Sequence, residues 1–525
     1  MPTDSLTDMP TIATASGELD PVQCYRALQA RDARFDGRFF IAVTSTRIYC
    51  RPVCRVRVPK AANCRFFRHA AQCEQAGYRP CLRCRPELAP RAERWSIQDA
   101  GAVLASSAAR GLDEIDGIDG IDDRADAPWW TGLAETLGVG ERELGRLFED
   151  RYGVSPQQYM RTRRLHDAML LLTDTRLAAG EVAATSGFGS PRRLNAAFVA
   201  HYRMTPTRLR QERAGDGRSS VVRLGYRPPY DIDAMLGFLE RRCVAGVETI
   251  TGQGATRRYL RTLRIESGTR RRQGWIEVSF EHERNRLALR IDDGLRDVLP
   301  AVIRRLRAAF DLDADPGAID AVLAADFPDS AGLRVPGTVD GFELAVRAIL
   351  GQQVTVAAAR TIAGRLVERF GDPVATPHPG LDRLFPTPAR LARAEPDTLG
   401  GIGIVRQRQA AIIALARAVE AGELPLSPAE DPTTTMARLR ALPGIGDWTA
   451  QYIAMRALHW PDAFPAGDIA LQRALGLPKS RHASVAAEQA SRAWRPWRSY
   501  AVLRAWHAPK GTTTQAMNPR EVASR

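Results

Sequence analysis

Two short segments decide the fold of the second half of this 525-residue chain: Leu442-Pro-Gly-Ile-Gly-Asp-Trp-Thr-Ala450 and Phe464-Pro-Ala-Gly-Asp468. The first is a Leu-Pro-Gly-x-Gly turn between two helical patterns. It presents backbone N–H groups at the start of a helix, where they can hold a phosphate without a basic side chain. Such turns are common between helices, so this one alone identifies no function. The second segment is a loop that ends in a carboxylate before another helical pattern, so a phosphate-binding turn and a carboxylate lie close together in the sequence.

Periodicity around these segments predicts the class of fold. From about 339 to 507, alanine, leucine, isoleucine and valine recur at helical spacing. Before this helical part, apolar and polar residues alternate over 275–280 and 286–291, which predicts two strands. We therefore expect a region with strands followed by an all-α region.

The two segments resemble the helix-hairpin-helix/Gly-Pro-Asp superfamily of DNA glycosylases and, within it, the AlkA-type 3-methyladenine glycosylases. Further matching stretches lie at 224–239, 346–352 and 494–500, so the resemblance covers about residues 220–510. It implies an α+β domain at 220–325 and an all-α glycosylase domain at 326–510. It also assigns roles to seven residues: Asp468 as the catalytic carboxylate, Trp448, Tyr452 and Trp506 in the base pocket, Gly444 and Gly446 as DNA contacts, and Gln353 as the wedge that props the duplex open.

The chemistry of base excision fits these residues. An alkylated purine carries positive charge and leaves readily, so the enzyme mainly extrudes the nucleotide and stabilises a cationic sugar in the transition state. A carboxylate supplies that stabilisation and can orient water, and electron-rich rings attract the cationic base. Trp448 and Tyr452 are four residues apart and share a helix face. Asp447 and Asp462 are local alternatives to Asp468, and Gln353 stands where a related enzyme has leucine.

Two absences narrow the reaction. No lysine occurs between Leu442 and Asp468, whereas a glycosylase that also cleaves the strand uses an amine to form a Schiff base. We therefore expect a monofunctional enzyme. No cysteine follows Cys243, which excludes a carboxy-terminal iron–sulfur cluster and the alkylguanine methyltransferase domain, whose acceptor is a cysteine.

A second functional unit is predicted from cysteines in the first part of the chain. Seven of the eight cysteines precede residue 85, which favours a local metal site in a reducing compartment. Cys50 and Cys54 form a C-x3-C pair and Cys81 and Cys84 a C-x2-C pair, and four such thiolates suit one tetrahedral zinc ion. Cys64 and Cys73, between the pairs, are alternative ligands or small core residues. Arginines crowd these pairs, so a zinc-bound thiolate could attack an alkyl group on DNA.

The stretches 39–57 and 77–84 resemble the amino-terminal domain of Ada-type adaptive-response proteins, which implies a domain at 21–92. In that family one zinc thiolate irreversibly takes a methyl group from a methylphosphotriester in DNA. The resemblance places the acceptor at Cys50 and the other ligands at Cys54, Cys81 and Cys84, whereas spacing alone does not choose among them. It places DNA contacts at Thr46, Arg55, Arg57 and Arg79. Arg47 departs from the family, where we expect glycine.

An internal repeat with a period of 50 predicts a tandem helix-turn-helix unit at 95–213. Leu144, Phe148, Tyr152, Ser155 and Pro156 recur as Leu194, Phe198, Tyr202, Thr205 and Pro206. Two helical hairpins that bind nothing would show the same repeat. The unit resembles the AraC class of activators, which implies recognition helices at about 141–150 and 191–200. Plausible DNA contacts on them are Arg142, Arg146, Arg192 and Arg193, or these are ordinary solvated side chains.

Composition agrees with a nucleic-acid partner. The formal charge is +14 and the pI about 9.8, although only three of the 74 basic residues are lysine, so codon bias also contributes. We expect no signal peptide, no membrane span and a cytoplasmic location. Residues 1–20 and 511–525 are predicted tails, 111–126 an acidic loop and 214–220 a linker.

We therefore predict a multidomain, mainly α protein with α+β parts that joins a methyl sensor to a DNA glycosylase. Its partners are double-stranded DNA, both alkylated and promoter, and RNA polymerase. Its cofactor is one zinc ion. One alternative is a transcription regulator whose glycosylase half is inactive and only grips DNA. Another is a repair enzyme whose helix-turn-helix unit no longer regulates.

Overall fold

The computed structural model describes residues 19–91, 100–114, 128–214, 221–267, 270–480 and 482–507. The predicted tails, the linker beyond Ala214 and the acidic repeat beyond Glu114 lie outside these ranges, apart from residues 19–20 at the end of the first tail. The start of the predicted acidic loop is wrong, because residues 111–114 form the last turn of α3 (Ala100–Glu114). Leu112 is fully buried in a small core, and this burial extends the helix. Among the described helices, none combines the length and apolarity needed to cross a bilayer.

The cysteine-rich unit is a small sheet flanked by two helices. Its strands lie in the order β3-β1-β2-β4, and β2 pairs with β4 in parallel. That pairing brings the two cysteine pairs together, because Cys50 ends β2 and the N–H of Cys81 donates to the carbonyl of Tyr49 (2.9 Å). The elements are α1 (Pro21–Ala30), β1 (Phe40–Val43), β2 (Ile48–Cys50), β3 (Cys64–Phe67), α2 (Ala70–Gln75) and β4 (Arg79–Pro80).

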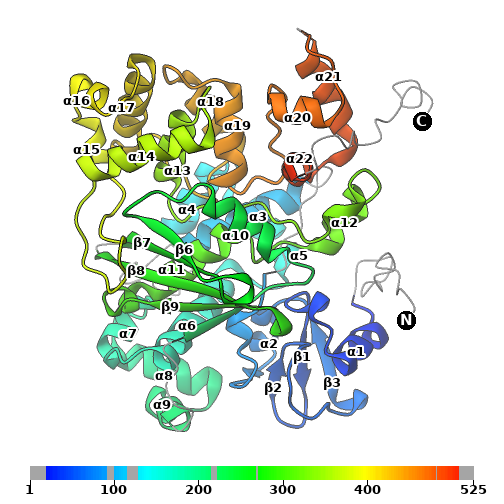
Figure 1. The fold of residues 1–525 in the computed structure, drawn as a ribbon. Coiled ribbons are helices and arrows are strands. Elements are labelled where there is room, and N and C mark those ends of the chain that lie inside the picture. The colour runs from blue at the N-terminus through cyan, green and yellow to red at the C-terminus, as the bar shows by residue number, and fades with distance from the viewer. Residues whose placement is uncertain are drawn as a thin grey trace.

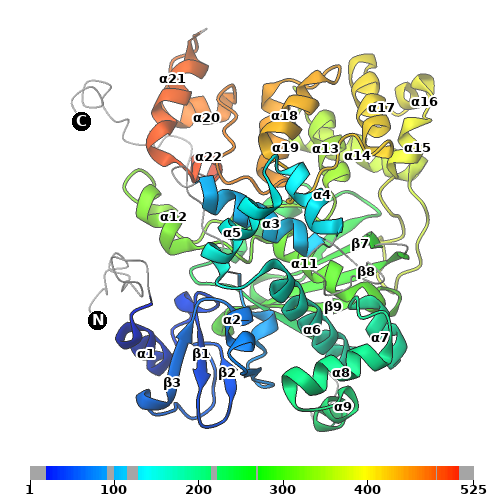
Figure 2. The ribbon, with the colours of Figure 1, turned by 180° about the vertical axis from the view of Figure 1, so that it is seen from behind.

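The repeat at period 50 forms two similar helical units joined by a long helix, α6 (Figure 2). The repeated leucine and phenylalanine are buried in both copies. The Ser155 hydroxyl accepts from the N–H of Gln158 (3.2 Å), the Thr205 hydroxyl from that of Arg208 (3.2 Å), and a proline opens each helix. The helices are α3, α4 (Pro128–Thr136), α5 (Glu141–Tyr152), α6 (Pro156–Asp174), α7 (Ala179–Thr185), α8 (Pro191–Tyr202) and α9 (Pro206–Ala214).

The α+β region contains a five-stranded antiparallel sheet in the order β5-β9-β8-β7-β6, at the centre of Figure 1. The two predicted strands are confirmed as β8 and β9. Strand β7 was not predicted, because polar residues are buried in it along with the apolar ones and no alternation results. Arg261, for example, is buried and pairs with Glu343 (2.7 Å). The elements are β5 (Val221–Gly225), α10 (Ile232–Glu240), β6 (Glu248–Thr251), β7 (Arg258–Ser267), β8 (Arg270–Glu281), β9 (Arg286–Ile291), α11 (Leu299–Ala309) and α12 (Pro316–Leu323).

The remaining chain is helical, as predicted, and lies above the sheet in Figure 1. Its helices share one large apolar core. They are α13 (Gly341–Leu350), α14 (Val356–Phe370), α15 (Pro388–Ala392), α16 (Pro396–Gly401), α17 (Arg406–Glu420), α18 (Pro432–Ala441), α19 (Asp447–Arg456), α20 (Ile469–Ala474), α21 (Ala483–Ala490) and α22 (Arg498–His507).

The units pack against one another and share an apolar core. One apolar core contains Leu88 of the cysteine-rich unit, residues of α6 and α8, and the inner face of the five-stranded sheet. The fully buried Arg227 donates to the backbone carbonyls of Asp36 (3.0 Å), Arg91 (2.5 Å) and Asp313 (2.7 Å). These interactions bind the cysteine-rich unit to the α+β region.

A buried polar cluster joins the cysteine-rich unit to the helix-turn-helix helices. The carboxylate of Glu74 in α2 accepts from the hydroxyl of Tyr49 (3.0 Å) and lies 2.9 Å from Nε2 of His166 in α6. The hydroxyl of Tyr202, at the end of α8, also donates to Glu74 (3.4 Å). Burial lowers the pKa of His166, but the charge and hydrogen bond of Glu74 together with the charges of Glu87 and Asp167 outweigh it, and the pKa is raised overall.

Candidate functional site

The Leu-Pro-Gly-Ile-Gly segment forms the predicted turn between α18 and α19. Gly444 has a φ of +77°, a conformation that favours glycine, and Gly446 is the exposed amino-terminal cap of α19. Gln352 fixes the turn from the neighbouring loop, because its Nε2 donates to the Gly444 carbonyl (2.9 Å) and to the Thr449 hydroxyl (3.0 Å). The first N–H groups of α19 are therefore held in place at the surface, where a DNA phosphate could bind.

Asp468 is fixed by three hydrogen bonds at the start of α20. Its Oδ1 accepts from the N–H of Leu471 (2.7 Å) and from Nε1 of Trp506 (3.0 Å), and its Oδ2 accepts from Nε1 of Trp448 (2.8 Å). These three N–H donors fix the orientation of this half-buried carboxylate.

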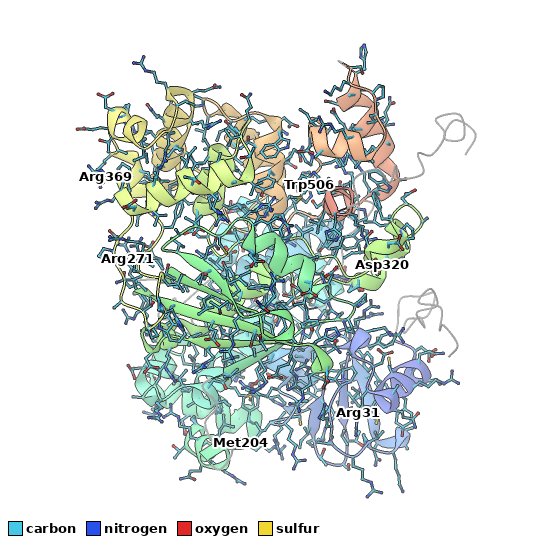
Figure 3. The ribbon with its side chains drawn as sticks, viewed as in Figure 1. Arg31, Met204, Arg271, Asp320, Arg369 and Trp506 are labelled. Carbon is cyan, nitrogen blue, oxygen red and sulfur yellow. The ribbon has the colours of Figure 1, made fainter. Side chains whose placement is uncertain are left out.

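The structure brings the three predicted pocket aromatics together beside this carboxylate. The rings of Trp448 and Tyr452 stack, with centroids 5.2 Å apart and an interplanar angle of 10°, and Trp506 lies 6.3 Å from Tyr452. Figure 3 labels Trp506 between the α13–α19 group and the α20–α22 group of helices. These residues form one electron-rich surface next to a negative charge.

Sequence reasoning missed Arg456. Its NH1 donates to the Tyr452 hydroxyl (2.6 Å), and its other nitrogens donate to the carbonyls of Pro336 (2.6 Å) and Gly337 (3.1 Å). Burial disfavours the Tyr452 phenolate, but Arg456 and Arg242 outweigh that effect and lower the Tyr452 pKa. The continuing four-residue spacing from Trp448 through Tyr452 was the signal that could have identified Arg456.

The two alternative carboxylates lie elsewhere. Asp447 is exposed and pairs with Arg440 (2.5 Å). Asp462 is buried in an ion pair with Arg498, with two oxygen–nitrogen distances of 2.7 and 2.8 Å. Each is thus engaged by an arginine and makes no hydrogen bond to the three aromatics in the described structure.

The predicted wedge residue, Gln353, lies in the loop between α13 and α14. Its side chain is exposed, and its backbone has a φ of +54°, which is unfavourable for a residue with a Cβ by about 1–2 kcal/mol. The loop therefore presents this side chain at the surface from a strained backbone.

The four predicted ligand cysteines meet in one cluster. The sulfur atoms of Cys50, Cys54, Cys81 and Cys84 all lie within 4.8 Å of one another. Four sulfur atoms at about 2.3 Å from a tetrahedral zinc ion would stand about 3.8 Å apart, so the cluster fits zinc. The backbone N–H of Arg51 donates to the Cys84 sulfur (3.4 Å), as expected for a thiolate acceptor. Cys64 and Cys73 lie outside the cluster and pack in the apolar cores of this unit.

The predicted DNA contacts of this unit lie at its surface. Thr46, Arg55 and Arg57 are exposed and Arg79 is partly buried. Arg47 has a φ of +55°, which explains why glycine is expected there. Its guanidinium lies 5.4 Å from the Tyr78 ring centre, so cation–π contact offsets part of the strain.

The two candidate recognition helices differ in charge. On α5, Arg146 pairs with Glu143 (2.6 Å) and Asp150 (3.6 Å). On α8, Arg192 and Arg193 are exposed and have no ion-pair partner among the described residues. The second helix therefore offers the more cationic surface.

Comparison with known proteins identifies each unit. The sequence matches the metal binding domain of Ada at 23–87, a helix-turn-helix domain at 133–212, the AlkA N-terminal domain at 221–340, and the HhH-GPD superfamily base excision DNA repair protein at 346–499. The multidomain fold predicted from the sequence is thereby confirmed.

Three relatives cover the chain in whole or in part. A probable bifunctional transcriptional activator/DNA repair enzyme AlkA of Mycobacterium tuberculosis is 39% identical over 92% of this chain and 95% of its own length. DNA-3-methyladenine glycosylase 2 of Escherichia coli is 36% identical over 54% of this chain and 96% of its own length. The bifunctional transcriptional activator/DNA repair enzyme Ada of Escherichia coli is 32% identical over 31% of this chain and 40% of its own length.

The zinc-binding, helix-turn-helix and glycosylase domains are those of proteins that bind and repair DNA. Nearly the whole chain aligns with a single relative, so these domains occur together in one kind of protein. The chain therefore belongs to the family of bifunctional transcriptional activator/DNA repair enzymes represented by the mycobacterial AlkA.

Proposed function

We propose that the carboxy-terminal half is a monofunctional DNA glycosylase that excises alkylated purines such as 3-methyladenine. The observation that carries this proposal is the Asp468 carboxylate, held by the indole N–H groups of Trp448 and Trp506 beside the Tyr452 ring. The HhH-GPD match and the glycosylase relative support it.

In the proposed reaction the extruded base stacks against the aromatic surface. The N-glycosidic bond breaks, and the leaving base takes the electron pair and becomes neutral. Asp468 stabilises the positive charge that develops on the sugar. Water then bonds to the anomeric carbon, and its proton passes to solvent by way of Asp468. The indole donors keep the carboxylate oriented throughout.

This proposal is tested by incubating the protein with duplex DNA that carries 3-methyladenine and analysing both products. We expect free 3-methyladenine and a strand that stays intact until alkali is added. If 3-methyladenine disappears from the duplex but no free base is recovered, hydrolysis of the glycosidic bond is contradicted.

We propose a second activity for the cysteine cluster, supported by the Ada match and by the meeting of four sulfur atoms. When bound, zinc would keep the Cys50 sulfur deprotonated, which is its nucleophilic form. The sulfur of Cys50 bonds to the methyl carbon of a DNA methylphosphotriester. The carbon–oxygen bond breaks, and its electron pair stays on the phosphate oxygen as a phosphodiester. The test is mass spectrometry of the protein after exposure to such DNA, with a 14 Da gain expected on the peptide that contains Cys50.

We further propose that methylated protein activates transcription through promoter DNA and RNA polymerase, with α8 as the main reading helix. Arg192 and Arg193 support this choice, because they are free of ion pairs in the described structure, whereas acidic neighbours engage Arg146. Replacing both arginines with glutamine should abolish selective promoter binding, and replacing Arg146 with glutamine should change it little.

The alternative of an inactive glycosylase half predicts a different site. A half that only grips DNA needs the turn at Gly444 and Gly446 but no oriented carboxylate. The three donors to Asp468 favour catalysis, and base release distinguishes the two.

A further inference from the structure

A cavity of about 320 Å³ lies between the cysteine-rich unit and the turn that joins β8 to β9. One wall contains Arg31 and the loop from Arg51 to Arg55, which connects the ligand cysteines Cys50 and Cys54. The opposite wall is the turn of the α+β region, with Arg284 and Arg286. Figure 3 labels Arg31 on the cysteine-rich unit. The cavity therefore borders the methyl-acceptor cluster but is shared with a different domain.

The cavity is strongly cationic. Five arginines and two carboxylates line it, and one of the carboxylates, Asp36, is already taken by the buried Arg51 (2.8 Å). Within the described structure no carboxylate lies at ion-pair distance from Arg55, Arg284 or Arg286. Burial, followed by the charges of Arg51 and Arg55 among others, lowers the pKa of Arg286. The charge of Glu281 opposes these effects on Arg286 only in part, and the arginines outnumber the carboxylates that line the cavity, so positive charge is in excess here.

Tyr226 lies between the cavity and the apolar core of the α+β region. Tyr226 lines the cavity and is 1% exposed, and its buried hydroxyl makes no hydrogen bond to any described residue. Its ring is fixed by packing against Tyr230, with centroids 4.9 Å apart. The ring therefore belongs to the apolar core: burial raises the pKa of Tyr226 to about 12, and the opposing charge is that of Arg334, which does not line the cavity.

We propose that this cavity binds a phosphodiester of the DNA whose methylphosphotriester is presented to Cys50, and that Arg284 and Arg286 bind it from the glycosylase half. The proposal rests on the proposed methyl transfer. A planar guanidinium group can donate to two phosphate oxygens at once, so Arg284 and Arg286 are suited to hold a phosphodiester. The α+β domain thus becomes part of the sensor's DNA-binding surface, beyond the contacts at Thr46, Arg55, Arg57 and Arg79.

A different explanation for the arginines is the charge of the metal site itself. Zinc with four thiolates carries a formal charge of −2, and nearby guanidinium groups could serve only to balance it. The two explanations predict different effects of neutralising the arginines. Charge balance predicts that the protein releases zinc, whereas phosphate binding predicts full zinc content and weaker DNA binding.

The test compares full-length protein with the double variant Arg284→Gln/Arg286→Gln. The matched control is Arg271→Gln/Arg272→Gln, which removes the same charge from the far end of β8, where both arginines pair with carboxylates (2.8 and 2.7 Å). Figure 3 shows Arg271 and Arg31 on opposite sides of the molecule. Three quantities are measured: zinc content, affinity for an unmodified duplex at several salt concentrations, and the rate of methyl transfer at low DNA concentration.

We expect the Arg284/Arg286 variant to keep its zinc and to bind duplex about tenfold more weakly for each arginine replaced. The slope of log affinity against log salt should fall by about 1 for each arginine, and methyl transfer should slow in parallel. The control should stay near wild type, whereas Arg284→Lys/Arg286→Lys, which keeps the charge but loses the paired donors, should keep the salt slope and bind with intermediate affinity. Tyr226→Phe, which removes only a hydroxyl buried in the core, should also stay near wild type.

Each of the remaining experimental outcomes contradicts one part of the proposal. If wild type itself transfers no methyl group, the proposed acceptor activity fails. If wild type transfers it and the double variant matches wild type in transfer rate and salt slope, the phosphate site fails. Loss of zinc in the double variant would assign the arginines to charge balance. If inorganic phosphate stabilises wild type but not the variant while DNA binding is unchanged, the site takes a free anion.

Discussion

Asp468→Asn is the sharpest test of the glycosylase site, because it removes one charge and almost no volume. In the folded protein Oδ1 accepts from Leu471 and Trp506, and Oδ2 accepts from Trp448. Asparagine can keep one oxygen acceptor. If that oxygen takes the place of Oδ1, the new NH2 group faces the indole N–H of Trp448, so two donors oppose each other.

The expected magnitudes separate catalysis from stability. Losing a charge aimed at a developing cation should slow base release by about 100- to 1,000-fold, or about 2.7–4 kcal/mol in the transition state. Asparagine caps a helix about as well as aspartate, so α20 should keep its start. The donor left without an acceptor at Trp448 should cost about 1–3 kcal/mol of folding stability. The variant should therefore fold and bind DNA.

The assay is single-turnover release of 3-methyladenine from a duplex, with binding to a duplex that carries an abasic-site analogue measured in parallel. The matched control is Asp447→Asn, the same change at the exposed carboxylate paired with Arg440, which should release base at the wild-type rate. Base release by Asp468→Asn within about threefold of wild type would refute the assignment. Equal slowing in both variants would point to a general effect of charge on DNA binding.

Four further predictions concern other parts of the molecule. Borohydride should trap no covalent enzyme–DNA adduct, because none of the three lysines lies at 442–468; a trapped adduct would show a lyase mechanism. Gln353→Gly should leave the melting temperature unchanged or higher, since it relieves the positive φ, yet slow excision from duplex; unimpaired excision would reject the wedge role. Methylation of Cys50 reduces the charge of the cluster from −2 to −1, so it should raise promoter affinity, and the gain should shrink as salt rises; equal affinity at low salt would uncouple the sensor from DNA binding. Because the folded-state pKa of His166 is raised, its pairing with Glu74 should stabilise the protein fully below pH about 6.5 and fade as pH rises through the raised value; melting curves of His166→Gln should then converge with wild type at alkaline pH, and a constant difference would contradict this.

The helical half was predictable because its signals are local. The turn at Gly444 and Gly446, the four-residue spacing of Trp448 and Tyr452, and the capping position of Asp468 are all properties of neighbouring residues. The meeting of the four cysteines was also expected from their spacing. The roles of these residues in catalysis stay predictions.

Contacts between distant segments could not be predicted in the same way. Nothing in the sequence distinguishes Glu74 from a surface glutamate. In the fold it is buried among Tyr49, His166 and Tyr202, which lie up to 128 residues away in the sequence. Strand β7 shows no alternation, because ion pairs allow Arg261 to be buried along with its apolar neighbours. Such pairings depend on how the domains dock, and no local pattern records that.

Arg227 has a consequence for how such a fusion can evolve. Its guanidinium is fully buried, its acceptors are carbonyls from the sensor and from the α+β domain, and burial lowers its pKa to about 10. DNA-3-methyladenine glycosylase 2 of Escherichia coli aligns over 96% of its own length with only 54% of this chain, so a glycosylase of this kind can exist as a shorter protein. Deleting the sensor would remove the carbonyls of Asp36 and Arg91, but it would also open the guanidinium to water, which can accept in their place. Separating the two domains would therefore cost their packed interface, and a hydrated arginine would remain where they met.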